Sequence, residues 1–581
     1  MTGAAAAGTA SVAVLVGRAL ARLGAGHCFG VVGSGNFHVT NALRASGVPV
    51  TAARHEGGAA TMADAFSRMS GTVALVSVHQ GCGLTNAATG IGEAAKSRTP
   101  VIVLAAEAGG ARSNFAMDQT GFGRALTAEA HRVTSPETAL DEVIAAFVTA
   151  RDDRRTVVLN LPLDVQSAPA PAAALATLET LHAPPPPAPR EPDPRDVSAL
   201  ADALQAARRP ILIAGRGARD ASGPLRDLAE ASGALLATSA VANGLFAGDP
   251  YALGISGGFA SPVSADLIAS ADLIVGVGCA LNMWTTRHGR LIAPTATVVQ
   301  VDVEAEALGL HRPVDLGVVG DSGATARAVT ALLRDRTPSG PAPDPRYRTP
   351  EVRERIASGS RWIDVPIDPA LTESPAAEPP GAETPAAEQR IDPRLLSAHL
   401  DHLLPPDRIV AIDSGNFMGY PSAYLGVPDE FGFCFTQAFQ SVGLGLATAI
   451  GAAIARPDRL PVLGAGDGGT LMAIAELETA VRLRIPLVAI VYNDDAYGAE
   501  VHHFGREEDL STVVFPPVDI AAIARGFGAE GVTVRAVEDL APLVDWLERR
   551  ARGERVPPIV IDARIADDGG SWWLAEAFRG H

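Results

Sequence analysis

Two glycine- and acid-rich segments near the C-terminal end constrain the fold of this 581-residue chain most strongly. Residues 464–470 read Gly-Ala-Gly-Asp-Gly-Gly-Thr and include the carboxylate of Asp467, and residues 491–498 read Val-Tyr-Asn-Asp-Asp-Ala-Tyr-Gly. Both segments adjoin apolar runs that are typical of buried parallel strands, and a helical pattern separates them. Because parallel strands end at one edge of a sheet, we expect Asp467 and Asp494 to converge there.

Oxygen ligands beside a glycine loop indicate a site for a metal ion and a phosphate group. Magnesium prefers hard oxygen ligands in octahedral geometry and often shares them with a phosphate. Backbone N–H groups of a glycine loop at a helix N-terminus bind phosphate oxygens. The two segments therefore predict a metal–diphosphate anchor. The alternative is a βαβ unit whose acidic residues serve only as helix caps and turn residues.

The two segments resemble the thiamine-diphosphate signature of the acetolactate synthase and pyruvate decarboxylase superfamily, a Gly-Asp-Gly followed by a pair of asparagines. Asp494 replaces the second asparagine, and aspartate coordinates magnesium at least as well. The resemblance implies that the carboxylates of Asp467 and Asp494 and the backbone carbonyl of Ala496 bind Mg²⁺. It also implies that thiamine diphosphate contacts Gly466, Gly468, Gly469, Tyr497 and Gly498.

A second resemblance to the same superfamily lies near the N-terminus, in residues 51–62 and 73–86. The run Arg-His-Glu-Gly-Gly-Ala-Ala and a later Thr-Asn match the half of the family site that binds the pyrimidine, and they place Glu56 at the activating glutamate. A buried carboxylate bonded to the pyrimidine favours the imino tautomer, which then removes the thiazolium proton intramolecularly. Taken alone, a glutamate at a helix start would instead indicate a partner for the helix dipole.

Residues 409–417 and 437–452 extend the resemblance. It implies that Gln440 offers its backbone carbonyl to the amino group of the pyrimidine. It also implies that Val442 is the apolar wedge that bends thiamine, although the family usually has a larger residue there. A tightly packed small-residue helix is the structural interpretation of residues 437–452. Gly415 and Asn416 follow a predicted strand, so we expect them to contact the diphosphate.

Three polar residues are candidates for catalysis beside the cofactor, namely His79, Gln80 and Gln119. His79 and Gln80 stand where the family has a small Ser-Gly pair, and an imidazole there could relay protons or bind a substrate oxyanion. A structural hydrogen bond to a neighbouring loop is the alternative for His79. Gln119 lies in a loop that matches a family segment whose glutamine points at the substrate.

Strand and helix patterns alternate through three parts of the chain, which predicts an α/β fold of three doubly wound parallel-sheet domains. We expect a pyrimidine-binding domain over residues 1–166, a central domain over 196–333 and a diphosphate-binding domain over 393–581. Residues 167–195 contain a proline run and read as a linker. Residues 334–392, rich in Pro, Ala, Glu, Ser and Thr, read as a second, mostly extended linker.

Composition excludes several other classes of protein. The net charge of −18 argues against nonspecific binding to nucleic acid. Four cysteines without a CxxC pair indicate free thiols in a reducing compartment rather than a disulfide or zinc framework. The sequence contains no run of about 18 apolar residues, so we expect no membrane helix. Residues 1–10 lack the basic and apolar regions of a signal peptide, so we expect a cytoplasmic protein.

The resemblance implies a thiamine-diphosphate- and magnesium-dependent decarboxylase or carboligase, acetolactate synthase-like, that acts on a 2-oxo acid through an enamine. The enamine is then protonated to an aldehyde or added to a carbonyl acceptor. It also implies a homodimer or a dimer of dimers, in which Glu56 of one subunit and Asp467 of another serve one site. The chain departs from acetolactate synthases in the central domain, where Trp284 replaces an arginine that helps to hold the substrate carboxylate.

Several alternatives stay open. A non-ligating decarboxylase or lyase of 2-oxo acids or acyl-CoA compounds would use the same residues, and residues 281–284 are closer to oxalyl-CoA decarboxylases. A catalytically silent regulatory homologue would bind the cofactor, but Glu56 and Asp467 are both present. Acetolactate synthases hold FAD in the central domain and related enzymes have lost it, so FAD is an alternative that we do not favour. A nicotinamide dehydrogenase is disfavoured because residues 30–35 and 215–217 contain only fragments of a GxGxxG fingerprint.

Overall fold

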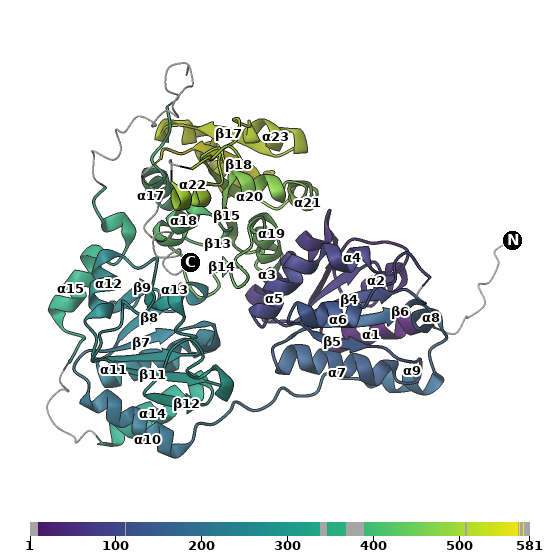
Figure 1. Ribbon diagram of the computed structural model, residues 1–581, viewed down its shortest axis with the longest axis horizontal. Coiled ribbons are helices and arrows are strands. Elements are labelled where there is room, and N and C mark those ends of the chain that lie inside the picture. Colours follow the sequence, from purple (N-terminus) through teal and green to yellow (C-terminus); the bar gives the residue numbers. More distant parts are fainter. Residues whose placement is uncertain are drawn as a thin grey trace.

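The computed structural model describes residues 10–110, 112–336, 345–367, 389–505, 508–567, 569 and 573. These residues form three α/β domains, each built on one six-stranded sheet. The paired strands run parallel, and helices cover both faces of each sheet (Figure 1). The predicted fold of three doubly wound parallel-sheet domains is therefore confirmed.

The first domain has the strand order β2-β1-β3-β4-β6-β5. Its elements are α1 (Val12–Leu23), β1 (His27–Gly30), α2 (Phe37–Ala45), β2 (Val50–Ala52), α3 (Glu56–Ser70), β3 (Ala74–Val78), α4 (Cys82–Asn86), α5 (Ala88–Lys96), β4 (Val101–Glu107), α6 (Gln119–Ala125), β5 (Glu129–Arg132), α7 (Ala139–Asp152), β6 (Thr156–Pro162), α8 (Leu163–Ser167) and α9 (Ala172–Glu179). One core packs α1, α2 and α7 on one face of the sheet, and another packs α3 and α5 on the other face. Because both faces are covered, β3 is buried throughout and β4 is buried up to its last residue, and apolar residues predominate in both strands.

The central domain has the strand order β12-β11-β10-β7-β8-β9. Its elements are α10 (Pro194–Ala206), β7 (Pro210–Ala214), η1 (Arg216–Ala221), α11 (Ser222–Ser232), β8 (Leu235–Thr238), η2 (Ala240–Ala242), β9 (Ala252–Ile255), α12 (Pro262–Ala269), β10 (Leu273–Val277), α13 (Met283–Thr286), β11 (Thr297–Asp302), η3 (Ala305–Ala307), β12 (Leu316–Val319), α14 (Ser322–Arg336), α15 (Pro350–Gly359) and η4 (Trp362–Asp364). A Cβ on Gly215 would lie 2.1 Å from the carbonyl oxygen of Gly278. Close packing of two turns thus accounts for this glycine without a dinucleotide.

The third domain repeats the topology of the first, with the order β14-β13-β15-β16-β18-β17. Its elements are α17 (Pro393–Leu403), β13 (Arg408–Ile412), η5 (Asn416–Met418), α18 (Gly419–Tyr424), β14 (Phe433–Phe435), α19 (Gly445–Ala455), β15 (Leu460–Gly466), α20 (Asp467–Met472), α21 (Glu476–Leu483), β16 (Val488–Asn493), α22 (Gly498–Phe504), α23 (Ile520–Phe527), β17 (Glu530–Val534), η6 (Val537–Leu540), α24 (Ala541–Ala551) and β18 (Ile559–Arg564). The strand order reverses between β13 and β15, as it does between β1 and β3. Ligand sites of open parallel sheets lie outside the strand ends at such points.

Parts of both predicted linkers are folded. Within 167–195, α9 packs on the first domain and buries Leu178 completely, and only the stretch from 180 to 193 runs as an extended connection to α10 (Figure 1). Within 334–392, α15 packs against α12 of the central domain. Residues 337–344 and 368–388 of that linker lie outside the described residues. Sequence reasoning missed these helices because the proline- and alanine-rich composition around them favoured extended linkers.

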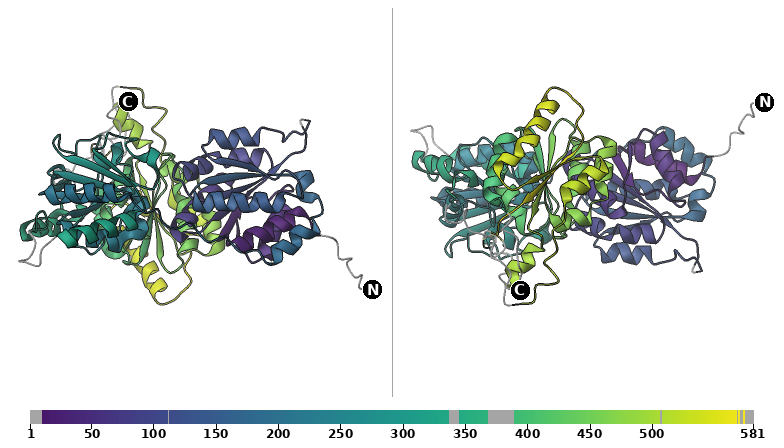
Figure 2. Two further views of the ribbon diagram at one scale, coloured as in Figure 1. Left: turned by 90° about the horizontal axis from the view of Figure 1, so that it is seen from below. Right: turned by 90° about the horizontal axis from the view of Figure 1, so that it is seen from above.

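The first and third domains share a core, whereas the central domain lies to the other side of the third domain (Figure 2). Helix α3 packs along α19 so closely that a Cβ on Gly451 would lie 2.3 Å from the carbonyl oxygen of Met62. The small residues of 437–452 therefore have the structural role expected of a tightly packed helix, over the part that forms α19. Among the described residues, no helix has both the length and the apolar character needed to cross a membrane.

Candidate active site

Two aspartates meet at the carboxyl edge of the third sheet. Asp467 is the first residue of α20, directly after β15, and Asp494 directly follows β16, which pairs with β15 in parallel register. The two carboxyl groups lie close enough for each to affect the pKa of the other. Burial raises the pKa of Asp494 well above its ordinary value, and the adjacent Asp467 raises it further. Burial likewise raises the pKa of Asp467, with a further contribution from Asp495. The pair is therefore an acidic, oxygen-rich site that suits a divalent cation.

Glycines leave room for these carboxylates and for a ligand beside them. A Cβ on Gly498 would lie 2.1 Å from Oδ2 of Asp494 and 3.3 Å from Cβ of Asn416, which places all three together. A Cβ on Gly468 would lie 2.7 Å from the ring of Tyr497. A side chain at either glycine would displace a group at the acidic site. Close approach thus accounts for the glycines at 468 and 498.

The two neighbours of Asp494 serve the loop rather than the acidic site. The side-chain amide of Asn493 donates to Asp562 at 2.7 Å. Asp495 accepts from Arg390 at 2.7 Å and from Arg564 at 2.8 Å. These ion pairs hold Asp495 in the left-handed region, at φ 56°. Of the three consecutive residues with oxygen-bearing side chains, 493–495, Asp494 is the one left beside Asp467 without a described basic partner.

The remaining predicted contacts on this side surround the same edge. The backbone N–H of Ala496 donates to the Asp494 carboxyl group, and that of Tyr497 donates to the carbonyl of Val513 at 2.8 Å. Gly466 ends β15, and a Cβ there would lie 3.1 Å from the ring of Phe417. Gly415 precedes the η5 turn, which begins at Asn416. The residues predicted to hold a diphosphate and its metal are therefore gathered at one sheet edge.

A loop with an exposed apolar side chain approaches the glycine segment. Gln440 is exposed with φ 57°, and Val442 is 41% exposed. Asp413, which is 1% exposed, accepts hydrogen bonds from the backbone N–H of Gly443 at 2.9 Å and of Leu444 at 3.2 Å. Sequence reasoning missed Asp413, although an acid directly after a strand at the point of reversal could have indicated it. A Cβ on Gly469 would lie 2.4 Å from Oδ2 of Asp413 and 3.3 Å from Cγ1 of Val442, so the loop adjoins the diphosphate side.

Glu56 begins helix α3 of the first domain and is 9% exposed. The side-chain amide of Asn86 donates to its Oε2 at 3.1 Å. The side chain of His55 caps the helix by accepting from the backbone N–H of Gly57 at 3.0 Å. Asn86 belongs to the Thr-Asn pair that first pointed to this half of the site. Among the described residues, no hydrogen bond joins Glu56 to Asp467 or Asp494 of the same chain.

His79 and Gln80 follow β3 at the point of reversal of the first sheet. Nε2 of His79 lies 3.3 Å from Oγ of Ser34, and its ring packs edge-on against Phe115 at 5.0 Å. A Cβ on Gly83 would lie 3.1 Å from Cβ of His79 and 3.4 Å from Oε1 of Glu56, which brings these two side chains to one glycine. Sequence reasoning missed Ser34, whose loop follows β1.

Two predicted catalytic glutamines are buried in the first domain. Gln80 is 5% exposed, and its Oε1 has no hydrogen-bond partner among the described residues. Gln119 is 2% exposed; its Oε1 accepts from the backbone N–H of Gly81 at 3.0 Å, and its amide donates to Asn160 at 2.9 Å. The first hydrogen bond supports the loop that follows His79, and the second fixes the Gln119 side chain to β6, so the structure gives this side chain a supporting position.

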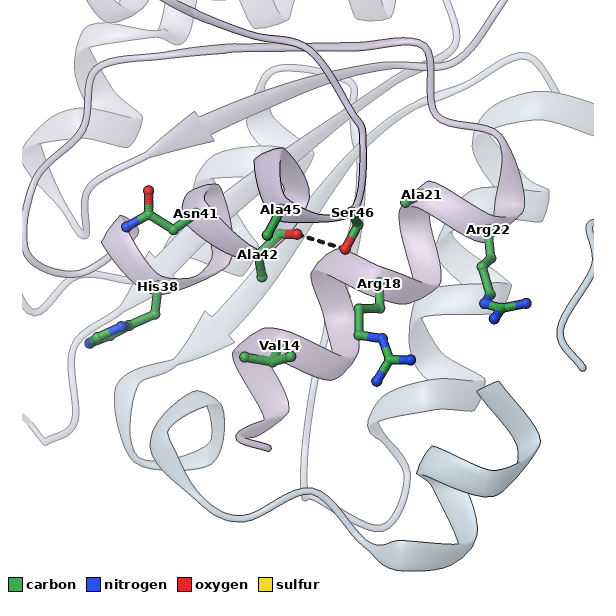
Figure 3. Close-up of a pocket in the computed structure, with 9 residues that line it drawn as sticks. All are labelled: Val14, Arg18, Ala21, Arg22, His38, Asn41, Ala42, Ala45 and Ser46. Carbon is green, nitrogen blue, oxygen red and sulfur yellow. Dashed lines mark hydrogen bonds between the residues drawn. The ribbon is translucent and has the colours of Figure 1, made fainter. Parts of the chain in front are cut away.

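A surface hollow of about 630 Å³ lies elsewhere on the first domain, between α1 and α2 (Figure 3). Its cationic residues, Arg18 and Arg22, both pair with Glu179. None of the predicted site residues lines it. The hollow therefore adds nothing to the site at the sheet edges.

Comparison with known families identifies each of the three domains. Models of thiamine pyrophosphate enzymes match it in three parts: the N-terminal TPP binding domain over residues 10–128, the central domain over 197–329 and the C-terminal TPP binding domain over 413–562. The two TPP binding domains contain the two half-sites described above.

Relatives that match along most of their length support the same family. A sulfoacetaldehyde acetyltransferase from Castellaniella defragrans is 29% identical over 534 residues, which cover 88% of this chain and 86% of the relative. A probable 2-ketoarginine decarboxylase from Pseudomonas aeruginosa is 29% identical over 559 residues, with 92% and 90% covered. A thiamine-diphosphate-dependent 4-hydroxybenzoylformate decarboxylase from Rhodococcus jostii shares the fold, with a TM-score of 0.76 at 22% identity over 96% of this chain and 100% of that chain. The chain therefore belongs to the thiamine pyrophosphate enzyme family and is a thiamine-diphosphate-dependent enzyme that forms or cleaves carbon–carbon bonds.

Proposed function

We propose that this protein is a magnesium-dependent decarboxylase or carboligase of 2-oxo acids, related to acetolactate synthase. The observation that carries the proposal is the facing pair of Asp467 and Asp494 at the ends of β15 and β16, within a glycine-lined edge. Together with the carbonyl of Ala496, these carboxylates would hold Mg²⁺. The residues that would hold the diphosphate end are Gly415, Asn416, Gly466, Gly468, Gly469, Tyr497 and Gly498.

Bound thiamine diphosphate would supply a nucleophilic carbon that adds to a carbonyl group and accepts the electrons left when CO₂ departs. Glu56 would hold a proton at the aminopyrimidine, and the hydrogen bond from Asn86 keeps its carboxylate in place. Gln440 would orient the opposite side of the pyrimidine through its carbonyl. Val442, exposed and close to Gly469, would support the bent form of the cofactor.

We further propose that the site is completed by a second copy of the chain. Within one chain, Glu56 accepts a hydrogen bond from Asn86 and Asp467 lies beside Asp494, in separate half-sites. Exposed apolar side chains accompany both half-sites, as a surface that becomes buried between subunits would require. They are Val32, Phe37 and Phe115 in the first domain and Phe439, Val442, Met472, Tyr497, Phe504 and Phe515 in the third.

The choice between ligation and simple decarboxylation depends on the groups around the reacting carbon. His79, hydrogen-bonded to Ser34 and adjacent to Glu56, could deliver a proton there, which favours a non-ligating decarboxylase as the second candidate. The named substrates of two similar proteins, 2-ketoarginine and 4-hydroxybenzoylformate, are 2-oxo acids. The substrate of this chain would accordingly be a 2-oxo acid, with a carbonyl acceptor if ligation occurs.

Two measurements test the proposal. The thermal midpoint should rise when Mg²⁺ and thiamine diphosphate are added together and should not respond to NADH; stabilisation by NADH alone would overturn it. A panel of 2-oxo acids should then release CO₂, and an added aldehyde or second 2-oxo acid distinguishes ligation from simple decarboxylation. A protein that binds the cofactor but turns over none of the panel would support a regulatory homologue instead.

A further inference from the structure

Two buried glutamates form hydrogen bonds between the first and third domains. Glu476 of the third domain binds backbone of the first, and Glu93 of the first domain binds backbone of the third. Glu476 of α21 is 2% exposed, and its Oε1 accepts hydrogen bonds from the backbone N–H groups of Arg54 and His55, each at 3.0 Å. These two residues immediately precede Glu56. A Cβ on Gly58 would lie 2.4 Å from the same oxygen, so a glycine there admits the contact. The third domain thus holds the backbone that carries the activating glutamate.

The first domain makes the reverse contact. Glu93 of α5 is fully buried; its Oε1 accepts from the backbone N–H of Ala438 at 3.0 Å, and its Oε2 accepts from that of Phe439 at 2.6 Å. The next residue is Gln440, which has φ 57°. A Cβ on Gly92 would lie 2.8 Å from the ring of Phe439, so a glycine again admits the approach.

Buried partners fix the Glu93 carboxylate. Arg68 donates to Oε1 of Glu93 at 2.8 Å and to Oδ2 of Asp64 at 2.7 Å. Arg68 also crosses the boundary, because its Nη1 donates to the carbonyl of Phe435 at 2.8 Å. Charge-assisted hydrogen bonds in such a buried network are stronger and more directional than exposed ones. The loop from 435 to 440 is therefore held from the first domain at three backbone groups.

We propose that Glu93 and Glu476 are reciprocal positioning residues, each of which fixes the cofactor-facing backbone of the opposite domain. The inference rests on the proposed function, in which Glu56 and the carbonyl of Gln440 contact opposite sides of the aminopyrimidine. A contact that only joined the domains would not need to end beside these residues. The Arg54–Glu478 pair shows the contrast, because it crosses the same boundary at 2.5 Å through partly exposed side chains alone.

The proposal predicts which end of the cofactor each change affects. Loss of either carboxylate should loosen the groups around the aminopyrimidine and leave the acidic pair at Asp467 and Asp494 unchanged. The test uses the full-length protein, stripped of cofactor, in calorimetric titrations with two probes in the presence of Mg²⁺. One probe is thiamine diphosphate, and the other is inorganic diphosphate, which lacks the pyrimidine.

Glu93→Gln and Glu476→Gln are each expected to weaken thiamine diphosphate binding by about tenfold, the size of one charge-assisted hydrogen bond. Inorganic diphosphate should bind both variants as it binds the wild type. Glu478→Gln, two residues from Glu476 on the same helix, is the matched control and should bind both probes normally. Glu93→Asp keeps the charge beside Arg68 but is one methylene shorter, so an intermediate loss is expected.

Thiamine diphosphate binding within twofold of the wild type in Glu93→Gln and Glu476→Gln would overturn the inference. Equal losses for both probes would also overturn it, because they would indicate general damage. If Glu93→Gln does not fold, Glu93→Asp decides for that position, and wild-type affinity there would count against it. A wild-type protein that binds neither probe would contradict the proposed function instead.

Discussion

The two halves of the cofactor site lie on sheets with the same strand order, yet they are held in different ways. In the third domain, Asp467 and Asp494 face each other, and no described basic side chain forms an ion pair with either. In the first domain, Glu56 is a single carboxylate that accepts a hydrogen bond from Asn86. The diphosphate half thus concentrates negative charge for a cation, whereas the pyrimidine half positions one acid by hydrogen bonds.

A similar contrast appears between two adjacent residues directly after β16, Asp494 and Asp495. Asp494 has another acid as its partner, and Asp495 has two arginines, Arg390 and Arg564. The two adjacent buried carboxylates therefore have different kinds of partner. Asp495, which is paired with arginines, fixes the turn, whereas Asp494 has no described arginine partner and is available to a cation.

The largest expected effect tests the pyrimidine half. Glu56→Gln preserves the shape of the side chain and an acceptor for Asn86 but removes the acid. We expect kcat to fall by roughly 100- to 10,000-fold, the range for loss of general acid–base catalysis. Calorimetry should still detect thiamine diphosphate binding. A variant with the wild-type rate would contradict the role of Glu56.

The next test addresses the diphosphate half. Asp494→Ala removes one of two facing carboxylates, and we expect the affinity for thiamine diphosphate with Mg²⁺ to fall by about 100-fold or more, since several kcal/mol of ion contact are lost. Asp494→Asn retains an oxygen ligand and should bind better than the alanine variant. Equal binding by both variants would show that the side chain at 494 does not hold the metal.

A pH experiment separates the loop at 440–444 from the metal pair. Burial raises the pKa of Asp413 from 3.8 to about 6, against the lowering effect of its backbone hydrogen bonds. The folded state therefore holds this proton more tightly than the unfolded state does. The stabilisation is fully present below about pH 4 and is lost as the pH rises through 6, with a size on the order of 3 kcal/mol.

We therefore expect Asp413 to add to the thermal stability of the cofactor-free protein when the pH is lowered from 7 to 5. Other titrating groups affect the wild type and an Asp413 variant alike, so the difference between the two proteins isolates this contribution. Asp413→Asn lacks this titration and should show a flatter dependence over the same range. Parallel curves for the two proteins would refute the assignment to Asp413. Scanning calorimetry of both proteins provides the measurement.

The smallest expected effect concerns substrate chemistry. His79→Ala removes the imidazole beside Ser34 and Glu56, and we expect kcat/KM for the 2-oxo acid to fall about tenfold, as for loss of one hydrogen bond to a charged group. Thiamine diphosphate affinity should not change. Ser34→Ala should have a smaller effect in the same direction. A loss of cofactor binding in either variant would assign the pair to the cofactor rather than the substrate.

The sequence was sufficient for the fold and for much of the third-domain edge. Apolar runs that end in glycine located β15 and β16, and their parallel pairing then required Asp467 and Asp494 to be close. Such patterns can be recognised because they lie within a short stretch of sequence and require no knowledge of distant contacts. The sequence could not show that Asp495 is held by Arg390, because that arginine is distant in the chain and follows a segment without periodicity.

Interactions between domains were the least accessible to prediction. Glu93 and Glu476 each act on backbone groups more than 340 residues away, at separations of 345 and 422 residues in the contacts to Ala438 and Arg54. A glutamate within an amphipathic helix gives no sign of such a partner. Gln119 illustrates the converse: a resemblance placed it toward substrate, whereas its hydrogen bonds join it to Gly81 and Asn160.

The glycine at 498 has a consequence for how this loop can vary. Because the space of its missing side chain is filled by Oδ2 of Asp494, even alanine at 498 would expel the carboxylate. At position 494 we expect a short side chain that presents an oxygen, such as asparagine, to retain part of the metal contact. In a mutational library we therefore expect position 498 to tolerate fewer substitutions than position 494, although only the side chain at 494 would contact the metal.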